Sequence, residues 1–280
     1  MEPGSSPLRS GNPLAVFPDA GGLTAADMQA IARTLNLSET TFVTSTTGDS
    51  YTVRIFTPHD ELPFAGHPTI GTSWVLRRLG IVTADEIVQS SSVGRTDVRV
   101  QGDQLWFERP GKAARDLEET DPGIDERLAK ALGLDVAEIG LEARELGRAG
   151  RLRPAFADAG VGHLLVPLRD LRALERCRPS APLLGEVTTI GVYCFTSMIA
   201  GRLRARGFFP AVGIDEDPAT GSAAAELGIL LADRAGDIDQ EVVQGVELKR
   251  PSRISVRARS NSVQVGGRCA PIYRARLDQE

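Results

Sequence analysis

Short apolar runs, some alternating with polar residues and most bounded by turn residues, recur along the chain and predict β-strands. In the first part of the chain the predicted strands lie at 12–17, 37–44, 51–57, 86–91, 96–100 and 105–108. Later strands are predicted within 160–167 and at 188–196, 255–257 and 262–266, with a turn at Ser260 and Asn261. The segment 201–210, which carries arginine and glycine, is left unassigned.

Apolar residues at helical spacing predict helices between these strands. Thr24 is expected to cap the first helix, with Asp27 three residues on, and that helix should end near Asn36. Other helices are predicted after Gly71, at 125–132, at 168–177 and after Gly221. Because strands and single helices interleave in both halves, the pattern indicates a mixed α/β or α+β fold.

One motif occurs twice: a titratable residue, proline, two residues, glycine and a hydroxyl residue. The first copy holds His67, Pro68, Gly71 and Thr72, and the second copy, 150 positions later, holds Asp217, Pro218, Gly221 and Ser222. Self-similarity of this kind usually reports a repeated structural unit. Since the interval is about half of the chain, the repeat predicts two similar half-chains of one fold.

Each copy of the motif is expected to start a helix, because proline is tolerated in a first turn and serine or threonine caps free amides. Two helix N-termini with small residues would present free backbone N–H groups, which suit a carboxylate or a developing oxyanion. A single copy is more often ordinary capping. Two matched copies with a titratable residue at the same offset favour a site between the half-chains.

The length of 280 residues favours two domains of roughly 100–150 residues each. Pro110, Gly111 and Lys112 break the strand pattern, so the predicted domains are 1–110 and 111–280, with the last residues of the chain packing back onto the first domain. A net charge of −5 with scattered arginines argues against a nucleic-acid surface. Residues 1–7 are expected to form a disordered leader.

Several site classes lack support in the sequence. Cys177, Cys194 and Cys269 are too widely spaced for a disulfide framework or a zinc site, which favours a reducing cytoplasm. No apolar run of about 18 residues predicts a membrane span, and no secretory signal opens the chain. No metal-ligand spacing connects His59 with His67, and no nucleotide-binding or nucleophile-elbow motif occurs. These absences leave room for an acid–base enzyme without metal or cofactor.

Glu39 and His67 look ordinary from the residues alone. A lone glutamate between a helix and a strand, such as Glu39, is usually solvated or a capping residue. His67 lies between Gly66 and Pro68, where a loop is expected, and this favours an exposed side chain.

Five stretches nevertheless resemble the phenazine-biosynthesis isomerase family, the PhzF-like proteins, which share the two-domain fold of diaminopimelate epimerase. They are GNPLAVF at 11–17, NLSETTFV at 36–43, RIFTP at 54–58, ELPFAGHPT at 61–69 and EDPATGSA at 216–223. The resemblance extends over most of the chain. It implies an α+β fold of two pseudo-symmetric halves, each a barrel-like mixed sheet around a central helix, with the active site between them.

The resemblance also implies roles for individual residues. Glu39 is expected to be the general acid/base, with His67, Asp217 and Ser222 as its polar surround. The substrate carboxylate is expected to bind backbone groups at the two predicted helix starts. These groups belong to Gly66, Gly71, Thr72 and Gly221. The family enzyme isomerises trans-2,3-dihydro-3-hydroxyanthranilate without metal or coenzyme, and a cytoplasmic homodimer is expected.

Two other functions stay open at this point. An amino-acid or hydroxy-acid racemase or epimerase would use two bases on opposite faces, for which Glu39 and Asp217 could serve. The cysteines that epimerase relatives use are absent from both motifs, which disfavours a two-cysteine mechanism. A binding protein on the same fold would need no acid–base chemistry.

The start of the chain departs from the family pattern. Family members usually carry a strand with an Asp-Ala-Phe sequence before Gly-Asn-Pro, whereas 2–10 is polar here. Either the first strand is missing or its start is assigned differently, and the N-terminal edge of the first sheet and the wall of the substrate cleft are the parts that this affects.

Overall fold

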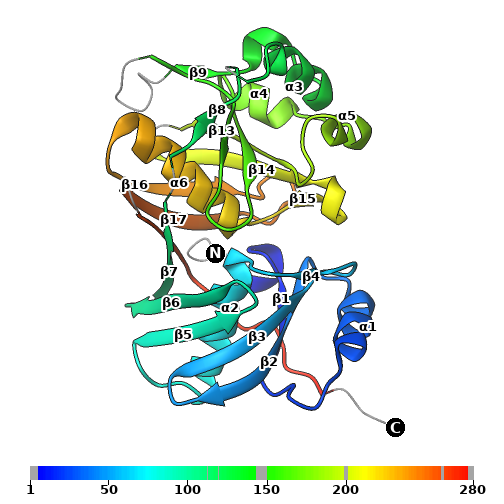
Figure 1. The fold of residues 1–280 in the computed structure, drawn as a ribbon, viewed down its shortest axis with the longest axis vertical. Coiled ribbons are helices and arrows are strands. Elements are labelled where there is room, and N and C mark those ends of the chain that lie inside the picture. Colours follow the sequence, from blue (N-terminus) through cyan, green and yellow to red (C-terminus); the bar gives the residue numbers. More distant parts are fainter. Residues whose placement is uncertain are drawn as a thin grey trace.

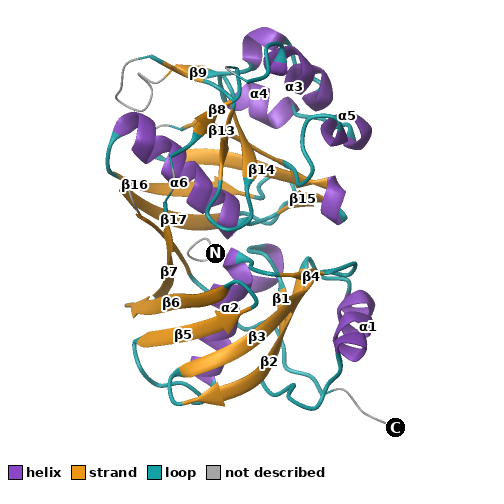
Figure 2. Ribbon diagram, in the orientation of Figure 1, coloured by secondary structure: helices purple, strands orange, loops and turns teal. Residues whose placement is uncertain are grey.

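The computed structural model describes residues 6–111, 113–118, 120–142, 150–198, 201–259 and 262–276. These residues form two lobes, one above the other, that share a continuous mixed sheet (Figure 1). Helices lie both inside the curved sheet and on its outer side (Figure 2). The turn predicted at Ser260 and Asn261 and most of the predicted leader, 1–5, lie outside the described residues.

The lower lobe holds the first strands of the chain. They are β1 (Leu14–Phe17), β2 (Glu39–Thr47), β3 (Ser50–Phe56), β4 (Glu61–Leu62), β5 (Glu86–Ser91), β6 (Gly94–Gln101) and β7 (Gln104–Pro110). Strand β1 runs parallel to β2, β3 runs parallel to β5, and the order is β1-β2-β3-β5-β6-β7 with β4 beside β3. Helices α1 (Ala25–Leu35) and α2 (Gly66–Arg78) belong to this lobe.

The upper lobe holds the other strands. They are β8 (Arg115–Asp116), β11 (Ala155–Ala157), β12 (His163–Pro167), β13 (Val192–Ser197), β14 (Leu203–Phe209), β15 (Ile214–Asp217), β16 (Ile238–Gln244), β17 (Ser252–Arg259) and β18 (Ser262–Gly267). Their order is β18-β17-β16-β14-β13-β12-β11-β8, with β15 beside β14; β9 (Leu141–Glu142) and β10 (Arg151–Leu152) pair separately. The helices are α3 (Ile124–Leu132), α4 (Leu171–Arg176), α5 (Ala181–Gly185) and α6 (Gly221–Ala235).

An antiparallel ladder between β7 and β18 joins the sheets of the two lobes. It pairs Pro110 with Ser262 at one end and Leu105 with Gly267 at the other. The two lobes are therefore connected by backbone hydrogen bonds between distant parts of the chain. The proposed domain boundary at residue 110 lies at the end of β7 and stays a prediction.

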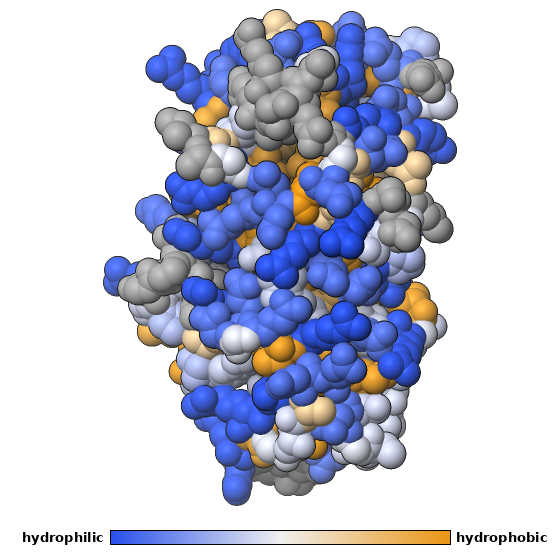
Figure 3. Space-filling view, turned by 90° about the vertical axis from the view of Figure 1, so that its left-hand side faces the viewer, coloured by the Kyte–Doolittle hydropathy of each residue, from blue (hydrophilic) through white to orange (hydrophobic). Residues whose placement is uncertain are grey.

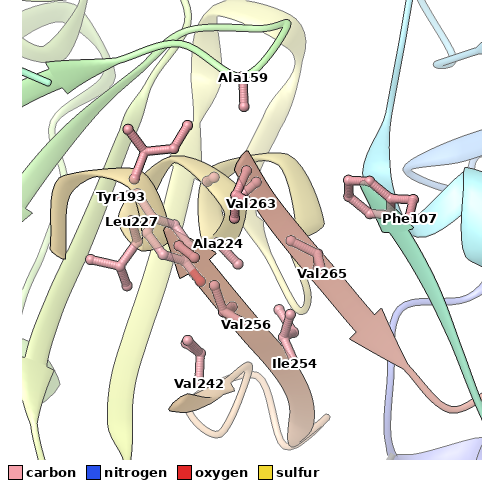
Figure 4. Close-up of a cluster of buried hydrophobic side chains, with 14 of the residues drawn as sticks. Phe107, Ala159, Tyr193, Ala224, Leu227, Val242, Ile254, Val256, Val263 and Val265 are labelled. Atoms are coloured by element: carbon pink, nitrogen blue, oxygen red, sulfur yellow. The ribbon is translucent and has the colours of Figure 1, made fainter. Parts of the chain in front are cut away.

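Each lobe has one helix that the sheet encloses. Helix α2 contacts β1, β2, β5, β6, β7 and β18, and α6 contacts β11, β12, β16, β17 and β18. Ala224 and Leu227 of α6 lie over strand residues such as Val256 and Val263 (Figure 4). The face seen in Figure 3 is mostly hydrophilic, with scattered hydrophobic side chains. The predicted α+β class is confirmed, because a large mixed sheet is combined with a small number of helices.

Local signals predicted several elements correctly. Thr24 and Asp27 form a reciprocal capping box on α1, and Asn36 ends that helix in the left-handed conformation. Gly133 likewise ends α3 with positive φ. The elements that were not predicted are helix α5 and strands β4, β8, β9, β10, β11, β14, β15 and β16.

The predicted start of the helix in the first motif is wrong. Helix α2 begins at Gly66, so Pro68 lies inside it, whereas Pro218 precedes α6. Gly71 and Thr72 therefore lie in the second turn of α2, where backbone amides bond within the helix. Their backbone amides are not free, so the argument that these amides bind the substrate carboxylate does not hold.

The outer side of β1 faces a cavity. Among the described strands β1 pairs only with β2. A cavity of about 1370 Å³ lies between β1, α2 and residues 268–276, which run along the lower lobe outside any strand. The N-terminal edge of the sheet is thus open on this side. No helix among the described residues combines the length and apolarity that crossing a bilayer requires.

Candidate active site

Glu39 begins β2 in parallel register with Leu14 and is 8% exposed. The residues that follow it, Thr40, Thr41 and Phe42, are fully buried, so the strand carries the carboxyl group into the protein. Its Oε2 is buried and has no hydrogen-bond partner among the described residues. Burial raises the pKa of Glu39 to about 7, although a hydrogen bond from Ser38 opposes the shift.

His67 lies in the first turn of α2 and is largely buried, so the predicted exposed loop position is wrong. Its Nδ1 is 3.6 Å from Glu39 Oε2, and its Nε2 is buried without a hydrogen-bond partner in the described structure. Burial lowers the pKa of His67 to about 4, against the Asp217 charge and a hydrogen bond to the Pro13 backbone. His67 is therefore neutral at pH 7.

Asp217 ends β15, four residues before α6 begins, and is 4% exposed. Its Oδ1 accepts a hydrogen bond from Asn12 Nδ2 at 2.7 Å, and its Oδ2 accepts one from Thr220 Oγ1 at 2.6 Å. Burial and then the Glu39 charge raise the pKa of Asp217 to about 7, while His67, Thr220 and Asn12 act in the opposite direction.

A buried glutamine holds the backbone around Asp217. Gln244 Nε2 donates to the Asp217 carbonyl at 2.7 Å, and Gln244 Oε1 accepts from the Thr220 amide at 3.0 Å. On β15 the neighbouring Glu216 forms two hydrogen bonds with Arg206, both at 2.8 Å. Since successive strand side chains point to opposite faces, this ion pair anchors β15 with Asp217 facing away from it.

The N-termini of α2 and α6 meet at two glycines. A Cβ atom on Gly66 would lie 2.8 Å from the Gly221 carbonyl carbon and from the Ser222 nitrogen. Only glycine permits this approach, and it brings the positive ends of both helices to one place. Free amides and helix dipoles at such a point favour a negative charge.

The site thus unites residues from both halves of the chain. Glu39, His67 and Asp217 come together, and Gly66, Gly221 and Ser222 form the contact between the helix ends. Gly71 lies against Leu14, and Thr72 donates to Thr41 at 2.9 Å inside the lower lobe.

Sequence reasoning missed the roles of Asn12, Thr220 and Gln244. The motifs that carry the resemblance include Asn12 and Thr220, which was the available signal, whereas Gln244 had none.

The large cavity next to β1 adjoins this site without containing it. Asn12, Gly66, His67 and Gly221 line its wall, whereas Glu39 and Asp217 do not. No group of three or more histidine, cysteine or acidic residues in the described part of the chain is arranged to hold a metal ion. The Glu39 and Asp217 carboxyl groups, which interact electrostatically, are the chemical centre that the geometry supports. Two interacting carboxyls with raised pKa values share a proton near neutral pH.

We expect Glu39 to make the protein less stable as the pH rises. The folded state binds the Glu39 proton more tightly than the unfolded chain does. The bound proton therefore contributes to the free energy of unfolding below about pH 4.5, and this contribution is lost as the pH rises to about 7. Glu39→Gln should therefore raise the free energy of unfolding at pH 8 by about 1–3 kcal/mol. Urea unfolding at pH 4 and pH 8 measures this, and equal stabilities of both proteins at pH 8 would contradict it.

Sequence similarity to known proteins extends over almost the whole chain. The family model described as "Phenazine biosynthesis-like protein" matches residues 5–275. A trans-2,3-dihydro-3-hydroxyanthranilate isomerase of Pseudomonas chlororaphis is 38% identical over 277 residues, which cover 93% of this chain and 89% of the relative.

Solved structures of other proteins have the same fold, and two of them illustrate the similarity to this chain. The Bacillus anthracis phenazine biosynthesis protein of the PhzF family has a TM-score of 0.78 and 25% identity, covering 94% of this chain and 92% of the other. A predicted epimerase of Pseudomonas aeruginosa has a TM-score of 0.78 and 28% identity, covering 97% and 95%. The fold that the resemblance implied is thereby confirmed.

Proposed function

Because the chain belongs to the phenazine biosynthesis-like family of isomerases, we propose that it isomerises a small carboxylate by moving a proton at Glu39. One observation carries the proposal: a buried carboxyl with a pKa near 7 has an oxygen without a hydrogen-bond partner, next to a buried neutral histidine. A group whose pKa lies near the working pH is suited to both giving and taking a proton.

The reaction requires two proton transfers and no other group. Glu39 takes a proton from one carbon of the substrate and returns a proton to another, so the product has the same atoms as the substrate. The amides at the N-termini of α2 and α6 would hold the substrate carboxylate and stabilise charge that develops on it. His67 Nε2, which has no partner in the described structure, is available to a polar group of the substrate.

The substrate in this proposal is trans-2,3-dihydro-3-hydroxyanthranilate or a close analogue. Support comes from the isomerase of Pseudomonas chlororaphis, which carries this compound in its name. We propose further that the reaction needs no metal or coenzyme. The homodimer that the resemblance implies stays a prediction, which light scattering would test.

A two-base epimerase is the second candidate, since Asp217 is also a buried carboxyl with a raised pKa. It would remove a proton from one face of a carbon and return one to the other face. The product would then be the mirror configuration at the same carbon.

Proton NMR in heavy water separates these possibilities. With trans-2,3-dihydro-3-hydroxyanthranilate and metal-free protein, we expect deuterium at a carbon that carried no exchangeable proton in the substrate, together with a shifted double bond. Deuterium at one carbon with inversion, using a panel of amino and hydroxy acids, would instead support the epimerase. Saturable binding without exchange on any compound would overturn both and favour a binding protein.

A further inference from the structure

The Asn12 side chain forms hydrogen bonds that reach from one lobe to Asp217 in the other. The Asn12 Nδ2 group donates to Asp217 Oδ1 at 2.7 Å and to the Ala219 carbonyl at 3.3 Å. The Asn12 Oδ1 atom accepts from the Ser38 hydroxyl at 2.8 Å. These bonds cross between the two lobes, since Asn12 lies just before β1 and Asp217 lies on β15.

The orientation of the Asn12 amide is determined by its neighbours. A carbonyl oxygen can only accept, so the group that faces Ala219 must be the NH₂. Turning the amide over would place Oδ1 against the Ala219 carbonyl and against Asp217. The amide oxygen must therefore face Ser38, and the Ser38 hydroxyl must donate its single proton to it.

This orientation directs the Asn12 NH₂ group at Asp217 and not at Glu39. Asp217 therefore receives an N–H donor that stabilises its carboxylate form.

We infer that Asn12 is a positioning residue that places the shared proton of the pair on Glu39 and the negative charge on Asp217. A second donor, Thr220 Oγ1 at 2.6 Å, satisfies the other oxygen of the Asp217 carboxylate, while Glu39 Oε2 receives no donor in the described structure. Asp217 is thus held as the fixed anion and Glu39 is the group that exchanges protons. The catalytic meaning of this assignment rests on the proposed function.

Other titratable groups around the pair do not reverse the assignment. His67 on α2 faces both carboxyls and is neutral near pH 7. Tyr193 on β13 donates its hydroxyl proton to Gln244 at 2.9 Å, and burial keeps the pKa of Tyr193 far above neutral.

The test is a ¹³C NMR titration of carboxyl carbons in protein labelled at aspartate and glutamate. In the wild type, we expect the Asp217 carbon to titrate at a lower pH than the Glu39 carbon, so that the shared proton resides on Glu39. Asn12→Leu removes the donor and should move the Asp217 midpoint upward by at least one pH unit. Ser38→Ala, the matched control, keeps the Asn12 donor and should leave the Asp217 midpoint in place.

These titrations require no substrate, and each outcome tests the inference. An Asp217 carbon that titrates above the Glu39 carbon in the wild type would overturn it, even if no variant folds. An unchanged Asp217 midpoint in folded Asn12→Leu would overturn the role of Asn12. A protein with the expected titration and no isomerase activity would refute the proposed function and leave the proton assignment standing.

Discussion

Glu39→Gln is expected to lower kcat/KM for the isomerisation by roughly 10²–10⁴-fold, the usual contribution of a general acid–base. Glutamine keeps the shape of the side chain but can neither give nor take a proton at carbon. The substrate carboxylate contacts, which we place at the N-termini of α2 and α6, remain intact. The loss should therefore fall on kcat, with KM nearly unchanged.

Matched controls separate this chemical effect from loss of structure. Glu61→Gln makes the same change on β4, where the carboxylate forms an exposed ion pair with Arg54, and should keep wild-type activity. Glu39→Asp keeps the carboxyl but shortens its reach by one carbon, so an intermediate loss is expected. Activity and solvent deuterium incorporation measured by NMR report all three variants. Wild-type turnover in folded Glu39→Gln would exclude Glu39 as the acid/base.

The second large effect is expected from Gly66→Ala. The added methyl group would lie 2.8 Å from backbone atoms of Gly221 and Ser222, which cannot move as a flexible side chain could. The two helix ends must then separate, at a cost of about 1–3 kcal/mol in the free energy of unfolding. Displacement of the site by about 1 Å should lower kcat/KM by roughly 10²-fold.

Gly185→Ala is the control for this substitution. Gly185 ends α5, and a Cβ atom there would contact nothing within 4 Å. This variant should match the wild type in urea unfolding and in turnover. If Gly66→Ala also matched the wild type in both measurements, the close contact between the helix ends would not be needed for the site.

Elements governed by local chemistry were predictable from the sequence. The ends of α1 follow from Thr24, Asp27 and Asn36, which act on the backbone within one turn. Strand β14 was missed because Arg204 and Arg206 interrupt its apolar pattern, although both are buried in ion pairs with Glu247 and Glu216. Those partners lie far along the chain or on another strand, so sequence pattern could not reveal the burial.

In the candidate site, too, the features that depend on distant contacts could not be predicted from the sequence. From the residues alone, Glu39 could not be distinguished from a solvated or capping glutamate, and only the resemblance assigned its role. Its raised pKa depends on burial in the folded sheet and acts together with Asp217, which comes from the other half of the chain. Asn12 and Gln244 are neutral amides whose function exists only through the groups they contact, so no pattern of spacing identified them.

The ladder between β7 and β18 also has a consequence for the order of folding. During synthesis β7 leaves the ribosome long before β18, its partner across more than half of the chain. Contacts of such sequence separation carry a large loop-closure cost and form late. The lower lobe can therefore collapse early, but its sheet can join the upper lobe only when nearly the whole chain has been released. Because Glu39 and Asp217 come from opposite sides of that ladder, catalytic competence should be the last property that the newly made protein acquires.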